Sequence, residues 1–337
     1  MGQLRRNPIN GQWVIIGVDN TTGSPEEFKK EKEIVQGKIN EGKCFFCYGN
    51  ESKTPSEVFA DRPQSTLPNS SGWFVRVVPN RFPALQIEGE LEKLGVGIYD
   101  RMNGVGAHEV IIEHPDHQKQ LAEVSDDDVK RVIGAYRERS VDLSKDKRFK
   151  YLLIFKNDGF LAGASMVHSH SQLIALPIVP KSVKEELIGG EEYLKYRDRC
   201  VFCDIIGQER NDGVRLVDEN RHFISFCPFF PRFPFEIWIL PKEHQANYSE
   251  IHSEEMLDFA RVLRTTLGRI RKRLRNPSYN FMLHTLPLDG FGNDAYHWHL
   301  EIIPKLTEIA GFEWGTGFYV NPTAPEDAAS WLKEVTI

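Results

Sequence analysis

Long apolar segments and an excess of basic side chains are both missing from this sequence. No stretch of the 337 residues approaches the roughly 20 apolar residues that a membrane-spanning helix needs. Residues 1–14 contain no apolar core of signal-peptide length. The formal net charge of −6 argues against nucleic acid as the main partner, because nucleic-acid-binding proteins usually carry a broad basic footprint. We therefore expect a cytoplasmic protein that binds neither membranes nor nucleic acid.

Cysteine is scarce, and its number is odd. The five cysteines form two Cys-x-x-Cys pairs, Cys44 with Cys47 and Cys200 with Cys203, and leave Cys227 alone. Such a set is poor material for a disulfide framework and good material for metal sites in a reducing compartment. The length fits two domains, each with enough chain for its own core.

Residues 157–172 join a glycine-bearing loop to alternating histidines. If residues 168–172 are extended, His168, His170 and Gln172 project from one face of the strand. The glycines and small residues before them let backbone N–H groups approach an anion. Isolated histidines on strands are usually structural, but burying three polar groups on one face without a purpose would be costly. The segment therefore indicates chemistry at phosphorus.

The chain repeats this organisation once. Glu109 lies eight residues before His117, and Glu236 lies eight residues before His244. Each copy then has a long amphipathic helix, starting at Ser125 and near Ser253, and ends in a His-x-His strand. The repeat predicts two similar domains, residues 1–185 and 186–337, with the boundary between residues 181 and 199.

The duplication also predicts two metal sites. Each copy offers a Cys-x-x-Cys pair, a distant histidine and the first histidine of its His-x-His strand, which together make a tetrahedral set for zinc. The predicted ligands are Cys44, Cys47, His117 and His168 in the first site, and Cys200, Cys203, His244 and His297 in the second. Four protein ligands leave no open position, so both sites should be structural. His114 and His252 compete as ligands, and reduced buried cysteines without metal are the alternative.

The two His-x-His strands differ at one position that bears on catalysis. Gln172 follows His170 by two residues and can donate hydrogen bonds to a phosphate oxygen. Glu301 follows His299 by two residues and would repel phosphate at that place. We therefore expect the first copy to carry the activity and the second to be degenerate, with His299 a packing or dimer-contact residue.

These motifs resemble the galactose-1-phosphate uridylyltransferase family, the transferase branch of the histidine triad superfamily, which includes relatives of the ADP-glucose phosphorylase type. The likeness covers nearly the whole chain, including both cysteine pairs, Asn80, Asn157, Ser165 and the motif at 168–172. It implies an α+β fold that duplicates a histidine-triad-like domain, each copy a mostly antiparallel half-barrel sheet with helices packed on it, and a homodimer.

The resemblance further implies a mechanism and roles for individual residues. His170 would attack the α-phosphorus of a nucleoside diphosphate sugar and form a covalent nucleotidyl-histidine, and a second phosphate compound would accept the nucleotide. Gln172 and Ser165 would hold phosphate oxygens, and Asn80 and Asn157 would contact the nucleotide. In some members a further metal site is built from glutamate and histidines. Here it would keep Glu186 and His284 but meet Glu301 and Ile303 elsewhere.

Three functions remain open. Uridylyl transfer between UDP-glucose and a hexose 1-phosphate such as galactose 1-phosphate is the first reading. The serines of the 168–172 motif and the segment 311–317 look more like an ADP-glucose phosphorylase, which transfers an adenylyl group to inorganic phosphate. The basic run at 269–275 suggests a non-catalytic, zinc-containing nucleic-acid-binding module, although a solvated helix face explains that run better. Two thiolates favour zinc at the second site, where iron is the alternative.

Overall fold

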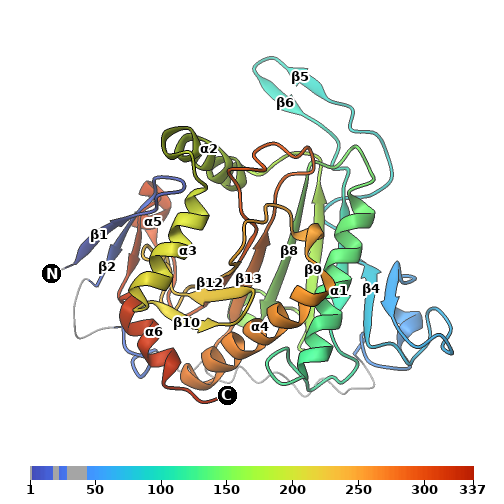
Figure 1. The fold of residues 1–337 in the computed structure, drawn as a ribbon. Coiled ribbons are helices and arrows are strands. Elements are labelled where there is room, and N and C mark those ends of the chain that lie inside the picture. Colours follow the sequence, from blue (N-terminus) through green and yellow to red (C-terminus); the bar gives the residue numbers. More distant parts are fainter. Residues whose placement is uncertain (1, 18–22, 29–43) are drawn as a thin grey trace.

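The computed structural model describes residues 2–17, 23–28 and 44–337. Its centre is a ten-stranded sheet, antiparallel throughout, with the strand order β10-β11-β12-β14-β13-β8-β9-β7-β4-β3 (Figure 1). The first half of the chain contributes β3 (Phe59–Asp61), β4 (Val75–Pro79), β7 (Ala107–Ile112), β8 (Tyr151–Asp158) and β9 (His170–Leu176). The second half contributes β10 (Leu216–Glu219), β11 (Phe223–Phe226), β12 (Ile237–Pro241), β13 (Tyr279–His284) and β14 (His299–Pro304).

The two halves join at the centre of this sheet. Strand β8 pairs with β13, from Tyr279 opposite Asp158 to Leu283 opposite Ile154. The expected α+β class, with a mostly antiparallel sheet and helices packed on it, is confirmed, and the strands of both copies form one continuous sheet. The boundary predicted between residues 185 and 186 falls inside α2 (Lys181–Arg197) and stays a prediction.

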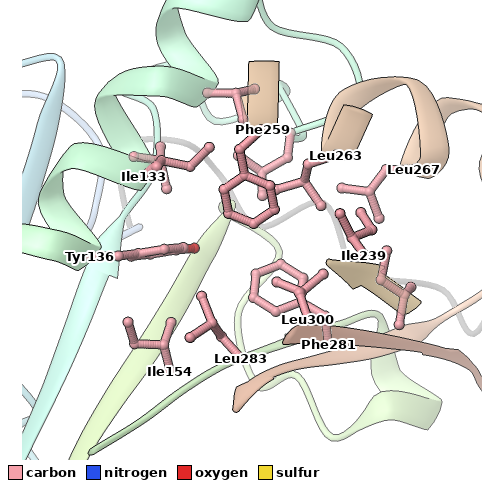
Figure 2. Packing of buried hydrophobic residues seen from close by; sticks show 14 of the residues in the cluster. Ile133, Tyr136, Ile154, Ile239, Phe259, Leu263, Leu267, Phe281, Leu283 and Leu300 are labelled. Atoms are coloured by element: carbon pink, nitrogen blue, oxygen red, sulfur yellow. The ribbon is translucent and has the colours of Figure 1, made fainter. Parts of the chain in front are cut away.

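Two long helices, α1 (Asp126–Leu143) and α4 (Ser253–Arg273), pack on one face of the sheet, which we call the helix face (Figure 1). Ser125 caps α1 by accepting a hydrogen bond from the Asp128 N–H, and the acidic first turn favours the helix dipole. The predicted apolar stripes of both helices are buried. Figure 2 shows Ile133 and Tyr136 of α1 meeting Phe259 and Leu263 of α4 above the strands.

The opposite side of the sheet, which we call the open face, is built differently in the two halves. In the second half, α2 and α3 (Val201–Asp212) cover it, and Phe202 packs in one cluster with Ile224, Trp238 and Leu240. In the first half, the open face carries a smaller cluster around Trp73, with Phe46 packed against it. On the open face of the first half, Asn157 and Gln172 stay partly exposed.

Smaller elements surround the main sheet. Strands β1 (Gln3–Arg6), β2 (Trp13–Ile16) and β15 (Tyr319–Asn321) form a second sheet, and β5 (Leu94–Val96) and β6 (Tyr99–Arg101) form a hairpin that projects from the body (Figure 1). Helices α5 (Gly311–Thr316) and α6 (Pro325–Lys333) lie near the C-terminus. None of the helices in the described part of the chain combines the length and apolar character that a bilayer crossing requires.

The expected equivalence of Glu109 and Glu236 is wrong by one strand position. Glu109 lies on the helix face, where its Oε1 is 2.7 Å from Arg139 Nη2. Glu236 lies on the other side, where its Oε1 accepts a hydrogen bond from Trp238 Nε1 at 3.1 Å. Strand pairing shows why: the connection from the strand to the matching histidine is one residue shorter in the second copy. Equal spacing in sequence therefore does not mean equal orientation.

Candidate active site

The motif strand β9 begins at His170, two residues later than the extended segment that the alternation predicted. His170 and Gln172 lie on the open face. Ser171 lies on the helix face, where its Oγ accepts a hydrogen bond of 2.7 Å from the Tyr136 hydroxyl. The alternation of the strand thus separates the reactive side chains from the core under α1.

His170 is held in one tautomer. Its Nδ1–H donates a hydrogen bond of 2.8 Å to the carbonyl oxygen of His168, which leaves the lone pair on Nε2. The side chain is buried, with the ring of Phe46 at a centroid distance of 5.4 Å. Burial first, and then the Lys156 ammonium, lower the pKa of His170. Both effects favour the neutral imidazole, which is the nucleophilic form.

The amide of Gln172 is oriented by a histidine that the sequence analysis did not single out. The Ala84 N–H donates to Nδ1 of His108 at 3.1 Å, so His108 carries its proton on Nε2. That Nε2–H donates to Oε1 of Gln172 at 2.8 Å. The NH₂ group of Gln172 is therefore left to donate to a ligand. Asn80 lies at the same place, with its Nδ2 3.1 Å from His108 Nε2.

The loop between β8 and β9 is tied to the second half of the chain. Asn280 on β13 donates from Nδ2 to Oδ1 of Asn157 at 2.8 Å and to the carbonyl of Ala162 at 2.9 Å. Gly159 has a φ of 82°, and a Cβ atom there would lie 2.0 Å from Oγ of Ser278. Only glycine fits this close approach, so the second copy helps to shape the loop of the first.

Several of the predicted substrate residues line one cavity. Asn157, Ser165 and His170 lie along a cavity of about 380 Å³, which is closed on its other side by Arg271 and Tyr279 of the second half. Asn80 and Gln172 do not line it and meet instead at His108 on the open face. The structure thus brings Asn157, Ser165 and His170 together at the cavity, and it brings Asn80 and Gln172 together at His108.

The first predicted metal site is assembled in space. The ligand atoms of Cys44, Cys47, His117 and His168 all lie within 4.8 Å of one another. The Nε2–H of His168 donates to the carbonyl of His114 at 2.7 Å, which turns Nδ1 toward the thiols. Burial lowers the pKa of His168 to about 4, so the ring is neutral, as a ligand must be. The competitor His114 contributes its carbonyl and not its ring.

The second predicted metal site has the same construction. The ligand atoms of Cys200, Cys203, His244 and His297 lie within 4.8 Å of one another. The Nε2–H of His297 donates to the Pro241 carbonyl at 2.9 Å, as His168 does in the first site. A hydrogen bond from the Cys203 thiol lowers the pKa of the Cys200 thiol, which favours the thiolate that binds metals. The competitor His252 caps α4 instead.

A third cluster of ligand atoms occupies the open face of the second half. It consists of Glu186, His284, His299 and Glu301, all buried. The expectation that the remaining ligand positions fall on Glu301 and Ile303 is wrong for Ile303, because strand pairing places His299 opposite His284 and His299 completes the cluster. Although burial opposes it, Glu186 raises the pKa of His284 to about 9. Arg232 lies 3.0 Å from Glu236 and also binds Glu301, so opposite charges already balance the cluster.

This cluster occupies the sheet positions that Asn157, His170 and Gln172 occupy in the first copy. Phe155 pairs with Gln172, and Met282 pairs with Glu301. Counting along these strands, His284, His299 and Glu301 correspond to Asn157, His170 and Gln172. In the second copy the ring of Trp238 stacks on His299 at a centroid distance of 5.1 Å, and the tilted ring of Phe202 packs against it at 5.2 Å. The same sheet positions are thus open to a ligand in one copy and filled by packing in the other.

The duplicated fold and its histidine site define a nucleotidyltransferase. The family model described as galactose-1-phosphate uridyl transferase, N-terminal domain, matches residues 1–180, and a domain of unknown function matches residues 102–334. The chain belongs to the galactose-1-phosphate uridylyltransferase family.

Two relatives and one solved structure describe the range of this family. The chain is 35% identical over 339 residues to an ADP-glucose phosphorylase from Arabidopsis thaliana, covering 99% of this chain and 93% of the relative. It is 27% identical over 347 residues to a galactose-1-phosphate uridylyltransferase from Thermotoga maritima, covering 100% and 99%. A solved structure of the Arabidopsis ADP-glucose phosphorylase with bound ADP-glucose matches with a TM-score of 0.82 and 33% identity, covering 100% of both chains.

The two Cys/His clusters predict two bound metal ions per chain. A Cys44→Ser/Cys47→Ser variant should lose one equivalent, because it removes two of the four ligands in one cluster. A Cys200→Ser/Cys203→Ser variant should lose the other. Metal content by inductively coupled plasma mass spectrometry checks this, with Cys227→Ser as the control that keeps both ions. Full metal content in either double variant would show that the corresponding cluster is not a metal site.

Proposed function

We propose that this chain transfers a nucleotidyl group from a nucleoside diphosphate sugar to a phosphate compound through a covalent intermediate on His170. The observation that carries the proposal is the hydrogen bond from Nδ1 of His170 to the His168 carbonyl, which leaves Nε2 as an unprotonated nucleophile on the open face. An amide donor, Gln172, stands two residues further along the same face of the strand.

The proposed reaction has two steps. The Nε2 lone pair of His170 forms a bond to the α-phosphorus, and the bond from that phosphorus to the sugar phosphate oxygen breaks, which releases sugar 1-phosphate. An oxygen of the second phosphate compound then attacks the same phosphorus and displaces the imidazole. The Nδ1–H bond to the His168 carbonyl stabilises the positive charge that the ring carries between the steps. Gln172 and Ser165 hold the phosphate oxygens, and Asn80 and Asn157 contact the nucleotide.

We favour ADP-glucose as the donor and inorganic phosphate as the acceptor. The higher sequence identity and the full-length structural match to the ADP-glucose phosphorylase support this choice, as do the serines at 169 and 171. Uridylyl transfer, which the sequence analysis placed first, is the second candidate because the Thermotoga uridylyltransferase also matches over the full length.

The third reading, a nucleic-acid-binding module, has little support. Much of the basic run on α4 is engaged within the protein: Arg271 Nη1 lies 2.8 Å from Glu123, and Lys272 Nζ donates to the Thr336 carbonyl at 2.9 Å. Arg269 donates to the Val217 carbonyl. Side chains used in this way offer few free charges to a phosphate backbone.

We propose zinc in both Cys/His clusters, since two thiolates and two imidazoles are its preferred tetrahedral set, with iron the alternative at the second cluster. The ligands His117 and His168 would then anchor the strand that aims His170. Reduced thiols of this kind fit the cytoplasm, where we place the protein.

We also propose that the protein is a homodimer in which the β5–β6 hairpin contacts a second copy. The hairpin exposes Ile98 by 91% and Tyr99 by 70%, and Leu94 and Val96 by about half. Apolar side chains on a projecting hairpin are unfavourable in water and typical of an interface.

The covalent step is tested by intact-protein mass after incubation with ADP-glucose and, separately, with UDP-glucose. We expect one adenylyl group on the wild type from ADP-glucose, and none on His170→Ala, because the variant lacks the nucleophile. A uridylyl adduct from UDP-glucose alone would move the assignment to uridylyl transfer. An adduct of equal yield on His170→Ala would disprove the role of His170.

The orientation of Gln172 is tested at His108. Gln172→Ala should lower kcat by about 10²-fold, the usual effect of losing one transition-state donor. His108→Phe should lower it less, because the amide stays but is free to turn its oxygen toward the phosphate. His222→Phe is the control, since His222 pairs with Asp258 at 2.8 Å, away from the motif strand. A wild-type kcat in His108→Phe would remove His108 from the site.

The interface is tested by charge on the hairpin. Ile98→Asp/Tyr99→Asp should sediment as a monomer at micromolar concentration, because two carboxylates cannot be buried against a partner copy. Leu67→Asp, at a residue that is 74% exposed outside the hairpin, is the control. Sedimentation velocity that gives a dimer for all three proteins would contradict the proposal.

A further inference from the structure

A buried network of charged and polar groups lies directly behind the motif strand, on the helix face. Lys156 and Glu113 form an ion pair, with Nζ 2.7 Å from Oε2 and both side chains at most 1% exposed. The Lys156 ammonium also donates to Oγ of Ser169 at 3.0 Å and to the carbonyl of His170 at 3.1 Å. Ser169 donates to Glu113 at 2.5 Å, and Tyr136 donates to Glu113 at 3.2 Å.

Folding by itself does not explain this network. Two charges removed from water pay a desolvation penalty that can exceed their attraction, and apolar residues of similar volume are often as stable or more stable. The network therefore calls for a reason beyond packing.

The second copy supplies the comparison. Ile111 pairs with Ser171, and Ile239 pairs with Leu300, so Ile111 and Ile239 hold the same position in the two copies. Glu113 and Pro241 lie two residues after them and therefore also correspond. By the same counting from Phe155 and Met282, Lys156 corresponds to Leu283.

The remaining counterparts are apolar as well. Ser169 corresponds to Trp298 by its place between the two histidines of the motif. Tyr136 corresponds to Leu263, because each lies eleven residues after the N-cap of its helix. Leu263, Leu283, Trp298 and Leu300 are all buried in one cluster, and Figure 2 shows Leu263, Leu283 and Leu300 there together with Tyr136. The same unit thus folds with an apolar core behind its degenerate His-x-His strand.

The charged version occurs behind the strand that carries the reactive histidine, and it touches that strand at its backbone. Lys156 holds the His170 carbonyl from the helix face, while the Glu113 N–H donates to the Ser169 carbonyl at 3.2 Å. On the open face the His170 ring is bound to the His168 carbonyl. The backbone of three successive residues is therefore fixed from both sides, and with it the direction of Nε2.

We propose that Lys156, paired with Glu113 and Ser169, is a positioning residue that aims His170 at the α-phosphorus. The inference rests on the proposed role of His170. A nucleophile that is misplaced by a fraction of an ångström loses rate without losing substrate affinity. Lys156 and Ser169 line the cavity, but the Lys156 and Glu113 side chains are at most 1% exposed, so we expect their contribution in the covalent step and not in nucleotide binding.

The test replaces the network by the chemistry of the second copy. Glu113→Leu/Lys156→Met/Ser169→Ala removes both charges and the hydroxyl between them, so no buried charge is left unpaired. We expect a free energy of unfolding equal to or above that of the wild type, a nucleotide Kd within about twofold, and formation of the nucleotidyl-His170 adduct slowed by about 10- to 100-fold in single turnover.

The matched control removes another buried ion pair of the helix face, between Glu109 of β7 and Arg139 of α1. Glu109→Leu/Arg139→Met deletes a pair with an Oε1–Nη2 distance of 2.7 Å. The hydrogen bonds of this pair do not involve Lys156 or the backbone of the motif. Its adduct formation should stay within about twofold of the wild type. An unchanged rate in the triple variant, or an equal loss in the control, would overturn the proposal.

Two further measurements keep the outcome decisive. If the triple variant does not fold, the single variant Ser169→Ala, which keeps the ion pair, serves instead. It should slow formation of the adduct at least threefold with unchanged nucleotide Kd, and a wild-type rate in this variant would refute the proposal.

Carbethoxylation of His170 by diethyl pyrocarbonate, followed by peptide mass, needs no nucleotide. It should differ at least threefold between the wild type and the triple variant but not the control. A wild type that forms no nucleotidyl adduct would disprove the proposed function. Equal carbethoxylation rates of His170 in the wild type and the triple variant would disprove the positioning role.

Discussion

The alternation of side chains along the central antiparallel strands is the constraint on which the rest of the molecule depends. Strand β9 pairs on both sides, with β7 and β8, so its register and the face of every residue are fixed. His170 and Gln172 therefore lie on the open face, and Ser169 and Ser171 lie under α1. A shift of one residue would turn His170 and Gln172 toward the helix face and the apolar side chains of the core toward the open face. The first Cys/His cluster, the buried ion pair and the hydrogen bond from His108 to Gln172 all act on this strand, whose orientation is fixed by its pairing.

The two copies of the unit have diverged at matching positions of one sheet. On the open face, Asn157, His170 and Gln172 of the first copy correspond to a buried set of two histidines and a glutamate, which Phe202 of α3 covers. On the helix face, a charged network in the first copy corresponds to leucines and a tryptophan in the second. The interiors of the two copies therefore differ: the first copy, which carries the proposed nucleophile, contains buried charges, and the second copy is packed with apolar side chains. Because the copies share a sheet, Asn280 of the second still shapes the loop of the first.

Support for the reactive strand comes from several directions at once. From one end, the ring of His168 is held between the Cys47 thiol and the His114 carbonyl. From the helix face, Lys156 holds the His170 carbonyl. From the neighbouring strand, His108 orients Gln172. Each of these contacts limits a different degree of freedom, and together they hold the proposed nucleophile His170 in place before substrate arrives, which is the condition for fast transfer without reorganisation.

The sequence by itself determined the α+β class, the repeat, the metal-type clusters and the motif with His170 and Gln172, because local spacing and period-two alternation record these directly. It wrongly predicted that Glu109 and Glu236 are equivalent, because equal spacing from the matching histidine does not reveal that the connection after the strand is one residue shorter in the second copy. Only the tertiary structure decided that His108 meets Gln172, that Asn280 reaches the Asn157 loop, that His299 joins Glu186 and His284, and that Lys156 pairs with Glu113 behind the motif. Each of these contacts joins residues far apart in sequence, and the strand register that brings them together is set by the packing of the whole sheet and not by any local signal.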